Sequence, residues 1–326
     1  MADRIRWGIL GAGSIARKFA QGLTSAEAGE LVAIGSRSQD KADAFGEEFG
    51  VPNRHGGYEA LADDPDVEAV YVATPHPMHR PNSILCLRAG KAVLCEKPFT
   101  VNADEARQVV AVAREKGLFL MEAMWTRFLP AIVRLRELLA GGVIGQVRMI
   151  LGDFGFRCGP NPQGRLLNPA LAGGGLLDVG VYPISLASMI LGEPVCVTGS
   201  AHIGDTGVDE QAGIVLTCAD GALAVLATGV RTTTPHEAWI LGTDGRIHLH
   251  AAWWRGSRIT VHTGDDSEDI DTPAVGNGYN YEADEVARCL AAGKTESDVM
   301  PLDETVAIME TMDTLRAQWG LRYPME

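Results

Sequence analysis

The fold is decided near the start of the chain, where residues 5–16 read IRWGILGAGSIA. The first six residues are mostly apolar and predict a short buried strand, after which a glycine-rich turn opens a helix. Gly11 permits a tight turn, Gly13 lets a ligand approach the backbone, and Ala16 allows close packing of the helix. The pattern therefore predicts a strand–loop–helix unit whose backbone amides hold a phosphate group.

The same rhythm of short strands and amphipathic helices continues to residue 123. Strands are predicted at 5–10, 31–36, 69–73, 92–95 and 118–121, with helices that begin near residues 15, 40, 78 and 103. Such alternation is typical of a parallel sheet with right-handed crossovers. We interpret residues 1–123 as a dinucleotide-binding Rossmann domain of an α/β protein. Its phosphate loop is predicted to consist of Gly11, Ala12, Gly13, Ser14 and Ile15.

The pattern changes in residues 124–326. From residue 146 to 271, strand-like segments separated by Asp-Gly and glycine-rich turns predict a large, mostly antiparallel open sheet. Helices are predicted at 176–191, 281–292 and 303–318. We interpret this half as an α+β domain that binds substrate and mediates oligomerisation. No long polar linker separates the halves, so we expect two tightly joined domains with a cleft between them.

Composition argues against several classes of partner. The chain has 42 acidic and 28 basic residues, and its formal net charge of -14 disfavours binding to nucleic acid or to an anionic membrane. No run approaches the ~20 consecutive apolar residues of a membrane helix, and the first strand leaves no room for a signal peptide. The six cysteines form no C-x-x-C pair, which indicates reduced, mostly buried thiols. We expect a cytoplasmic protein with a small-molecule substrate.

The end of the second predicted strand bears on cofactor choice. NAD-selective enzymes usually place Asp or Glu there, about 20 residues beyond the glycine loop. This chain has Ser36, Arg37 and Ser38 instead, with Lys41 one turn later. Hydroxyl, guanidinium and ammonium groups suit a 2′-phosphate, which favours NADP(H) over NAD(H). The alternative is that Arg37 and Lys41 are solvated surface charges.

Two further stretches carry groups suited to proton chemistry. Lys97 lies in the sequence CEKP, at the carboxyl end of a predicted parallel strand where ligands of α/β sheets bind. Downstream, residues 173–182 read GGGLLDVGVY and place Asp178 and Tyr182 one helical turn apart, where they could share a proton path. Alternatively, Lys97 is an ordinary surface lysine, Asp178 complements a helix dipole and Tyr182 is a packing residue.

Taken together, these stretches resemble the Gfo/Idh/MocA oxidoreductase family, and among its branches the trans-dihydrodiol dehydrogenases and NADP-dependent D-xylose dehydrogenases. The resemblance spans the whole chain and is carried by residues 11–16, 36–37, 91–98, 118–128 and 175–182. It implies that Lys97 and Tyr182 serve the chemical step and that Asp178 orients the substrate or the tyrosine. It further implies contacts to cofactor or substrate from Trp125, Arg127, Phe154 and either Trp253 or Trp254, of which Trp254 is our candidate.

The resemblance also concerns the loops around the predicted active site. It implies cofactor contacts from Thr74, His76, His79 and Glu96, and a cis peptide between Lys97 and Pro98. His76 stands where many members of the family have asparagine, a departure shared by the dihydrodiol branch. We predict no catalytic metal, because no carboxylate or thiol pattern accompanies the histidines.

The function implied is hydride transfer between a nicotinamide and a sugar or small cyclic diol, with Tyr182 exchanging the hydroxyl proton and Lys97 assisting. Two alternatives remain open: a redox-assisted glycoside hydrolase with tightly bound nucleotide, and a non-catalytic nucleotide sensor. The resemblance implies a homodimer or homotetramer formed through the C-terminal sheet. The sequence does not distinguish between a sugar and a diol as substrate.

Overall fold

The computed structural model describes residues 4–326, which form two compact units. Unit 1 contains the chain up to residue 128 together with residues 275–306, and unit 2 contains residues 129–274 and 307–326. The sequence interpretation divided the chain after residue 123 and placed the whole remainder in one domain. The structure differs in that a late segment returns to complete the first unit.

Unit 1 is built on six parallel strands in the order β3-β2-β1-β4-β5-β6, which confirms the predicted Rossmann sheet. The strands are β1 (Ile5–Leu10), β2 (Gly29–Gly35), β3 (Asn53–His55), β4 (Ala69–Val72), β5 (Ala92–Glu96) and β6 (Leu120–Ala123). The helices are α1 (Ser14–Leu23), α2 (Gln39–Phe49), α3 (Tyr58–Ala62), α4 (His79–Arg88), α5 (Ala103–Lys116) and α8 (Tyr279–Ala291). Strand β3 and helix α3 were not predicted, because three and five residues are too few to show a period.

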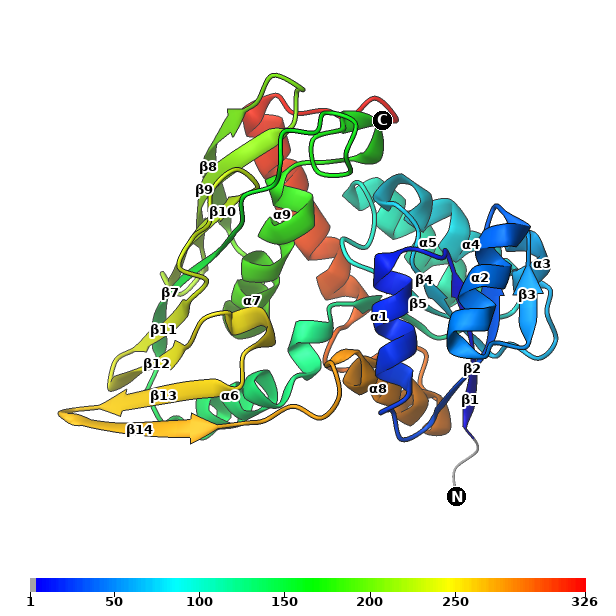
Figure 1. The fold of residues 1–326 in the computed structure, drawn as a ribbon. Helices are drawn as coiled ribbons and strands as arrows, with labels where there is room; N and C mark the ends of the chain where they lie inside the picture. Colours follow the sequence, from blue (N-terminus) through cyan, green and yellow to red (C-terminus); the bar gives the residue numbers. More distant parts are fainter. Residues whose placement is uncertain (1–3) are drawn as a thin grey trace. The chain divides into compact units, whose positions relative to one another are not determined.

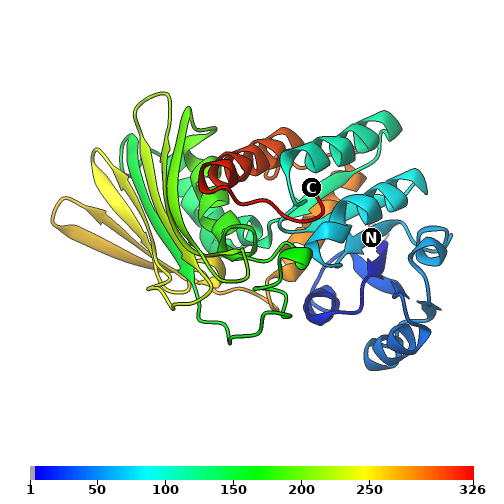
Figure 2. The same ribbon diagram turned by 90° about the horizontal axis from the view of Figure 1, so that it is seen from above.

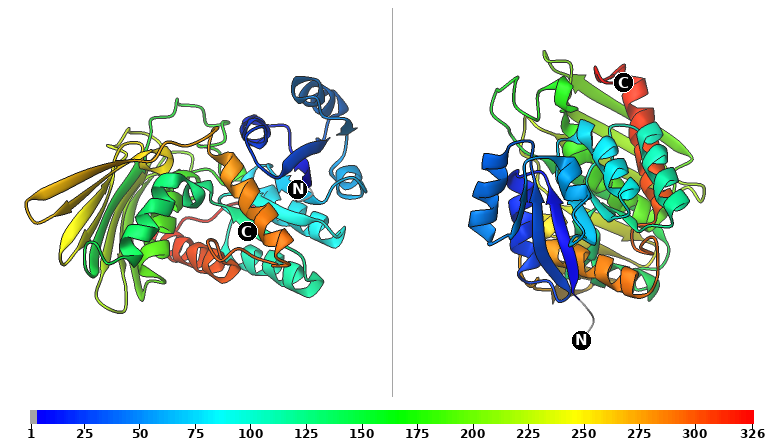
Figure 3. Two further views of the ribbon diagram at one scale, coloured as in Figure 1. Left: turned by 90° about the horizontal axis from the view of Figure 1, so that it is seen from below. Right: turned by 90° about the vertical axis from the view of Figure 1, so that its right-hand side faces the viewer.

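Helix α8 packs against α1 although it is distant in sequence (Figure 3). Gly22 lies so close to α8 that a Cβ atom there would be 2.8 Å from Cβ of Tyr279. Asp284 accepts the backbone N–H of Glu27 at 2.8 Å. The sequence predicts that this helix belongs to the second domain. Its period reveals an apolar face, but it does not reveal which part of the fold that face packs against.

Unit 2 is built on eight strands in the order β14-β13-β12-β11-β7-β10-β9-β8. The strands are β7 (Val147–Gly155), β8 (Cys196–Ile203), β9 (Asp209–Thr217), β10 (Leu223–Gly229), β11 (Ala238–Gly242), β12 (Gly245–Leu249), β13 (Arg258–Thr263) and β14 (Asp266–Asp271). Only β7 and β10 pair in parallel, so the sheet is mostly antiparallel, as predicted. The helices α6 (Pro130–Ala140), α7 (Val181–Leu191) and the later turns of α9 (Leu302–Trp319) lie on one face of it (Figures 1 and 2).

The opposite face of this sheet carries apolar side chains that the fold leaves partly exposed. Val225 of β10 lies in register with Val215 of β9 on one side and with Leu151 of β7 on the other. These three side chains are 41%, 38% and 37% exposed. Three exposed apolar side chains in one row across a sheet form a surface suited to association with another protein surface.

The segment Pro169–Leu191 is long and apolar enough to cross a membrane by length and composition. However, 78% of its most apolar stretch is buried inside the fold. It therefore has the character of a core helix of unit 2. The six cysteines are free thiols and four of them are buried, which confirms the expectation drawn from their spacing.

Candidate functional site

The loop between β1 and α1 has the shape that a pyrophosphate requires. Gly11 has a φ of +109°, and a Cβ atom there would lie 2.8 Å from the carbonyl oxygen of Ala73, so a larger residue would be strained. A Cβ atom at Gly13 would meet nothing within 4 Å, which shows open space beside this glycine. Ala16 is fully buried under the loop. These observations fit the predicted phosphate loop.

The first turn of α1 strengthens this interpretation. It contains no acidic side chain, and no side chain caps its N-terminus. The N-terminal amides of a helix carry a partial positive charge and are available to an anion when no side chain occupies them. Unit 1 therefore presents both the space and the electrostatics for a nucleotide pyrophosphate.

Beyond β2, the predicted 2′-phosphate residues lie at the surface of unit 1. Ser36 is buried, and its hydroxyl accepts the N–H of Ser38 at 3.4 Å. Arg37 and Lys41 are exposed, and within residues 4–326 neither forms an ion pair with a carboxylate. Tyr58 lies beside Arg37. Partial burial raises the pKa of Tyr58, and the Arg37 guanidinium opposes that rise.

The loop that follows β4 is tied to the loop that follows β5 through His79. One ring nitrogen of His79 is 2.7 Å from the carbonyl oxygen of Thr74, and the other is 2.8 Å from that of Pro98. Burial lowers the pKa of His79, and the two carbonyl contacts oppose this effect. His76 is also buried, with its ring 5.8 Å from that of His79. The described contacts of His79 join two loops of the sheet edge, and the cofactor contacts expected of Thr74, His76 and His79 stay predictions.

The turn that carries Lys97 is held by buried carboxylates. The Lys97–Pro98 peptide is cis, as the resemblance implied. Glu96 accepts a very short hydrogen bond from the Tyr71 hydroxyl with one oxygen and the Lys97 N–H at 3.1 Å with the other. Glu122 of β6 accepts the N–H of Phe99 at 3.1 Å. Lys97 is thus presented, half-buried, at the end of β5 by a backbone turn with defined anchors.

Sequence reasoning missed the buried acid Glu282, which belongs to the same region of unit 1. Glu282 is fully buried in α8, and neither of its carboxylate oxygens has a hydrogen-bond partner within residues 4–326. Burial raises its pKa well above the usual range, and the negative charge of Glu96 raises it further. No motif could have revealed this residue, because it comes from the returning helix.

Trp125 and Arg127 lie in the short 3-10 helix Trp125–Phe128 of unit 1. The Trp125 ring stacks on Tyr279 with centroids 4.8 Å apart. Arg127 is 2% exposed and donates to both carboxylate oxygens of Glu304, at 2.9 and 2.6 Å, and to the carbonyl of Val299. These contacts brace the returning segment. The expected contacts of Trp125 and Arg127 with nicotinamide and substrate stay predictions.

In unit 2, the glycine-rich stretch leads into a helix as predicted, but the helix begins irregularly. Residues Leu176–Gly180 form a π-helical turn that continues into α7. Asp178 and Tyr182 are both buried, at 4% and 7% exposure. Asp178 forms a short ion pair with Arg165, a residue that the sequence reasoning missed because nothing distinguishes it from other loop arginines. π-Helical turns often occur at functional sites, since the extra residue redirects the side chains that follow.

The aromatic side chains around Tyr182 form a compact cluster in unit 2. Phe154 contacts Tyr182 edge-on at 5.2 Å and stacks on Trp254 at 3.5 Å. His236, which sequence reasoning did not select, packs edge-on against Trp254 at 4.7 Å. Trp253 instead is buried at 2% exposure and donates its indole N–H to the carbonyl of Asp153 at 2.8 Å. Trp254 is therefore the tryptophan that stacks on Phe154, the ring that contacts Tyr182.

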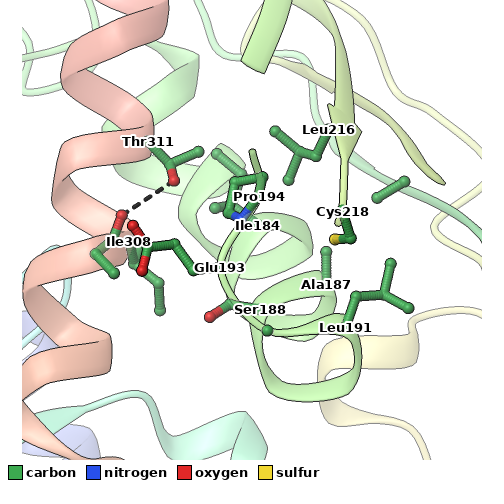
Figure 4. A pocket seen from close by; sticks show the side chains of 13 residues that line it. Ile184, Ala187, Ser188, Leu191, Glu193, Pro194, Leu216, Cys218, Ile308 and Thr311 are labelled. Carbon is green, nitrogen blue, oxygen red and sulfur yellow. Dashed lines mark hydrogen bonds between the residues drawn. The ribbon is translucent and has the colours of Figure 1, made fainter. Parts of the chain in front are cut away.

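A separate pocket of unit 2 lies between α7, α9 and the sheet (Figure 4). Its lining includes Ile184, Ala187, Leu191, Leu216, Ile308 and Thr311. The Thr311 hydroxyl donates to the carbonyl of Ala307 at 3.0 Å. None of the predicted site residues lines this pocket, so we do not assign it to the active site.

A Rossmann unit with a phosphate loop, followed by an open-sheet unit, is the architecture of a two-domain, nucleotide-dependent oxidoreductase. Comparison with known proteins agrees with that class. Residues 5–124 match the family described as "Oxidoreductase family, NAD-binding Rossmann fold", and residues 132–248 match the GFO/IDH/MocA C-terminal domain. The chain belongs to the Gfo/Idh/MocA oxidoreductase family, as the sequence resemblance implied.

Relatives within this family are similar along nearly the whole chain. Trans-1,2-dihydrobenzene-1,2-diol dehydrogenase from Mus musculus is 39% identical, with 99% of each chain covered, and the protein of that name from Homo sapiens is 36% identical with the same coverage. Among solved structures, a 3-ketoreductase from Actinomadura kijaniata in complex with NADP and TDP-benzene has a TM-score of 0.86 at 29% identity, with 97% and 98% covered. An aldose-aldose oxidoreductase from Caulobacter crescentus has a TM-score of 0.88 at 27% identity, with 95% and 96% covered.

Proposed function

We propose that the chain is an NADP(H)-dependent dehydrogenase or reductase that transfers hydride between nicotinamide and a CH–OH group of a sugar or small cyclic diol. The proposal is carried by the presence, in one chain, of a glycine loop suited to a pyrophosphate and of the buried Tyr182, which packs against an aromatic cluster. The relatives support it, because they include dihydrodiol dehydrogenases and a ketoreductase solved with NADP.

The residues present fit an NADP cofactor. The loop Gly11–Ser14 would hold the pyrophosphate through its amides, and Ser36, Arg37 and Lys41 would hold the 2′-phosphate. Support for the phosphate assignment comes from Arg37 and Lys41, which are exposed and pair with no carboxylate in the described part of the chain. When bound, the nicotinamide supplies a ring carbon that accepts or donates hydride.

Tyr182 is proposed to take the proton of the substrate hydroxyl in oxidation and to return it in reduction. Lys97 is proposed to stabilise negative charge that develops on the same oxygen, since an ammonium group acts as a point charge. Asp178 is proposed to orient the substrate or the tyrosine. Its ion pair with Arg165 restricts the Asp178 side chain to one orientation. Retention of all three groups argues against a purely sensing role.

Phe154 and Trp254 are proposed to form the apolar wall of the substrate site. They stack with ring planes 13° apart, and Phe154 lies edge-on to Tyr182 with ring centroids 5.2 Å apart. Such faces suit the C–H surface of a sugar ring and the apolar face of a cyclic diol alike. Both substrate classes therefore belong in the first assay.

We propose that the protein acts in the cytoplasm as a homodimer or homotetramer. The exposed row formed by Leu151, Val215 and Val225 supports association through the outer face of the unit 2 sheet, because burying these side chains removes apolar surface from water. A closed symmetric assembly would pair this face with itself.

The test is to measure NADPH and NADH formation by absorbance with aldoses, anhydrosugars and trans-dihydrodiols, each cofactor being supplied separately. NADP-selective reduction with one substrate class supports the proposal and identifies that class. Release of sugar without net reduction would point to a redox-assisted hydrolase. Demonstrated NADP binding with no turnover of any compound would point to a sensor.

A further inference from the structure

The glycine stretch before Asp178 and Tyr182 is held at three points by side chains from other segments of unit 2. Asp209, the first residue of β9, accepts the N–H of Leu176 at 2.6 Å. Thr228 of β10 donates its hydroxyl to the carbonyl of Gly175 at 3.3 Å. Tyr323, near the C-terminus, donates its hydroxyl to the carbonyl of Gly173 at 2.7 Å. The entry to the helix is therefore fixed by tertiary contacts.

The Asp209 contact explains why the chain needs glycine here. Gly174 has a φ of +117°, and a Cβ atom on it would lie 2.1 Å from one carboxylate oxygen of Asp209. A Cβ atom on Gly175 would lie 3.3 Å from the other oxygen. Side chains at these positions would push the carboxylate away, so the glycines and Asp209 form one fitted unit.

Asp209 also lies where its charge has most effect on the helix. It is fully buried and bonds the amide of Leu176, the first residue of the π-helical turn. A carboxylate at a helix N-terminus satisfies an otherwise unpaired amide and interacts favourably with the helix dipole. Holding the first amide fixes the start of the turn, and with it the directions of Asp178 and Tyr182 farther along.

We propose that Asp209 is the positioning residue of the active site: by bonding the Leu176 amide it fixes the register of the π-helical turn and so orients Asp178 and the Tyr182 hydroxyl. This inference rests on the proposed function for the role of Tyr182. It adds that catalytic geometry depends on a carboxylate that touches neither substrate nor cofactor.

The C-terminal segment supports the same loop from the other side. Tyr323 is 1% exposed, and the Arg316 guanidinium lies 5.1 Å from its ring centroid. Arg316 in turn donates to both carboxylate oxygens of Glu326, at 2.8 and 2.9 Å. The last residues of the chain are thereby drawn against α9, which keeps the Tyr323 hydroxyl on the carbonyl of Gly173.

The charge state of Asp209 supplies a readout that a merely structural residue would lack. Burial raises the pKa of Asp209 to about 7, while the amides of Leu176 and Gly175 and the Arg316 guanidinium oppose the rise. Tyr323 also faces it, and burial together with the Asp209 charge raises the pKa of that phenol. Ionised Asp209 binds the Leu176 amide more strongly than the protonated acid does. Turnover is therefore expected to increase as Asp209 loses its proton.

The experiment compares Asp209→Asn, Asp209→Ala and the control Glu210→Gln in the full-length protein. Glu210 is the next residue of β9, and its carboxylate pairs with Arg231 at 3.6 Å instead of contacting the loop. Each variant is assayed for kcat, for KM of substrate and NADP⁺, for the pH profile of kcat, and for amide hydrogen exchange in residues 173–182.

We expect Asp209→Ala to lower kcat about 10- to 100-fold, as small misplacements of catalytic groups do, with KM for NADP⁺ unchanged and faster exchange in residues 173–182. Asparagine can still accept the Leu176 N–H, so Asp209→Asn is expected to keep kcat within about threefold and to lose the limb of the pH profile near neutrality. Glu210→Gln is expected to match the wild type.

The proposal is overturned if Asp209→Ala keeps wild-type kcat and exchange, or if Asp209→Asn retains the same pH limb as the wild type. If Asp209→Ala fails to fold, the pH profile of Asp209→Asn still decides the outcome. A wild-type protein without hydride transfer would refute the proposed function alone. The exchange data would then show independently whether Asp209 orders the turn.

Discussion

Replacing Glu122 with glutamine tests whether the stability of the protein depends on protonation of this buried carboxylate in unit 1. Glu122 is 1% exposed, and burial raises its pKa from the ordinary value of 4.5 to about 7, although Arg127 and the Phe99 amide oppose the rise. Between these two pKa values the folded protein binds more protons at this site than the unfolded chain does. The contribution of Glu122 to stability is therefore full below about pH 4.5 and falls as the pH rises to about 7.

The magnitude follows from the shift. A difference of about 2.5 pKa units, at about 1.4 kcal/mol per unit, corresponds to about 3 kcal/mol. Glutamine does not ionise, so its stability lacks this pH dependence. As the pH rises from about 4.5 to about 8, the unfolding free energy of Glu122→Gln should therefore increase by about 3 kcal/mol relative to that of the wild type. Its amide oxygen can still accept the Phe99 N–H, so kcat should change by less than about threefold.

The assay is equilibrium denaturation of wild type and variant across this pH range, followed as the difference in unfolding free energy. Glu115→Gln, at an exposed position of α5, is the control for replacing a glutamate with glutamine at the protein surface. A Glu122→Gln difference that does not change with pH would refute the reasoning, because it would mean that folding leaves the pKa of Glu122 unchanged.

Three further predictions concern the candidate site, and a fourth concerns the proposed association of chains. Tyr182→Phe should lower kcat about 100-fold or more while leaving NADP⁺ affinity unchanged by calorimetry; near wild-type turnover would remove Tyr182 from the chemical step. Gly11→Ala should weaken NADP⁺ binding measurably, because φ is +109° and strain of about 1–3 kcal/mol must be relieved in the loop; equal affinity would contradict the assigned phosphate loop. Arg37→Ala should raise KM for NADP⁺ roughly 10- to 100-fold and leave KM for NAD⁺ unchanged; a parallel loss for both would exclude a 2′-phosphate contact. Val225→Lys should lower the mass observed by light scattering towards that of one chain; an unchanged mass would place the interface elsewhere.

The Rossmann unit was predictable because its signals are local. The spacing of apolar residues predicts the strand at residues 5–10 and the helix that follows, and glycine predicts the turn at Gly11. Both signals lie in contiguous residues and do not depend on the rest of the fold. The same holds for the position of Lys97 at a strand end, whereas the cis peptide that follows it was implied by the family resemblance. The short elements β3 and α3 were missed, because three and five residues are too few for a period to repeat.

The candidate-site region of unit 2 was only partly predictable. The order of Asp178 and Tyr182 on a helix was visible, whereas the π-helical turn and the contact from β9 to its first residue were not, because no local pattern marks them. Arg165 and His236 carry no local signature. The adjacent residues Trp253 and Trp254 cannot be distinguished in the sequence, whereas in the structure Trp254 stacks on Phe154 and Trp253 bonds the carbonyl of Asp153.

By itself the sequence determined the fold class, the glycine-rich turn after the first strand and the identity of the groups suited to proton chemistry. These properties depend on the period of apolar residues and on the chemistry of single side chains. The tertiary structure decided which carboxylates are buried, which tryptophan stacks on Phe154 and where helix α8 packs. Those outcomes depend on contacts between residues far apart in the chain, and their energies come from burial and close approach that no local pattern encodes.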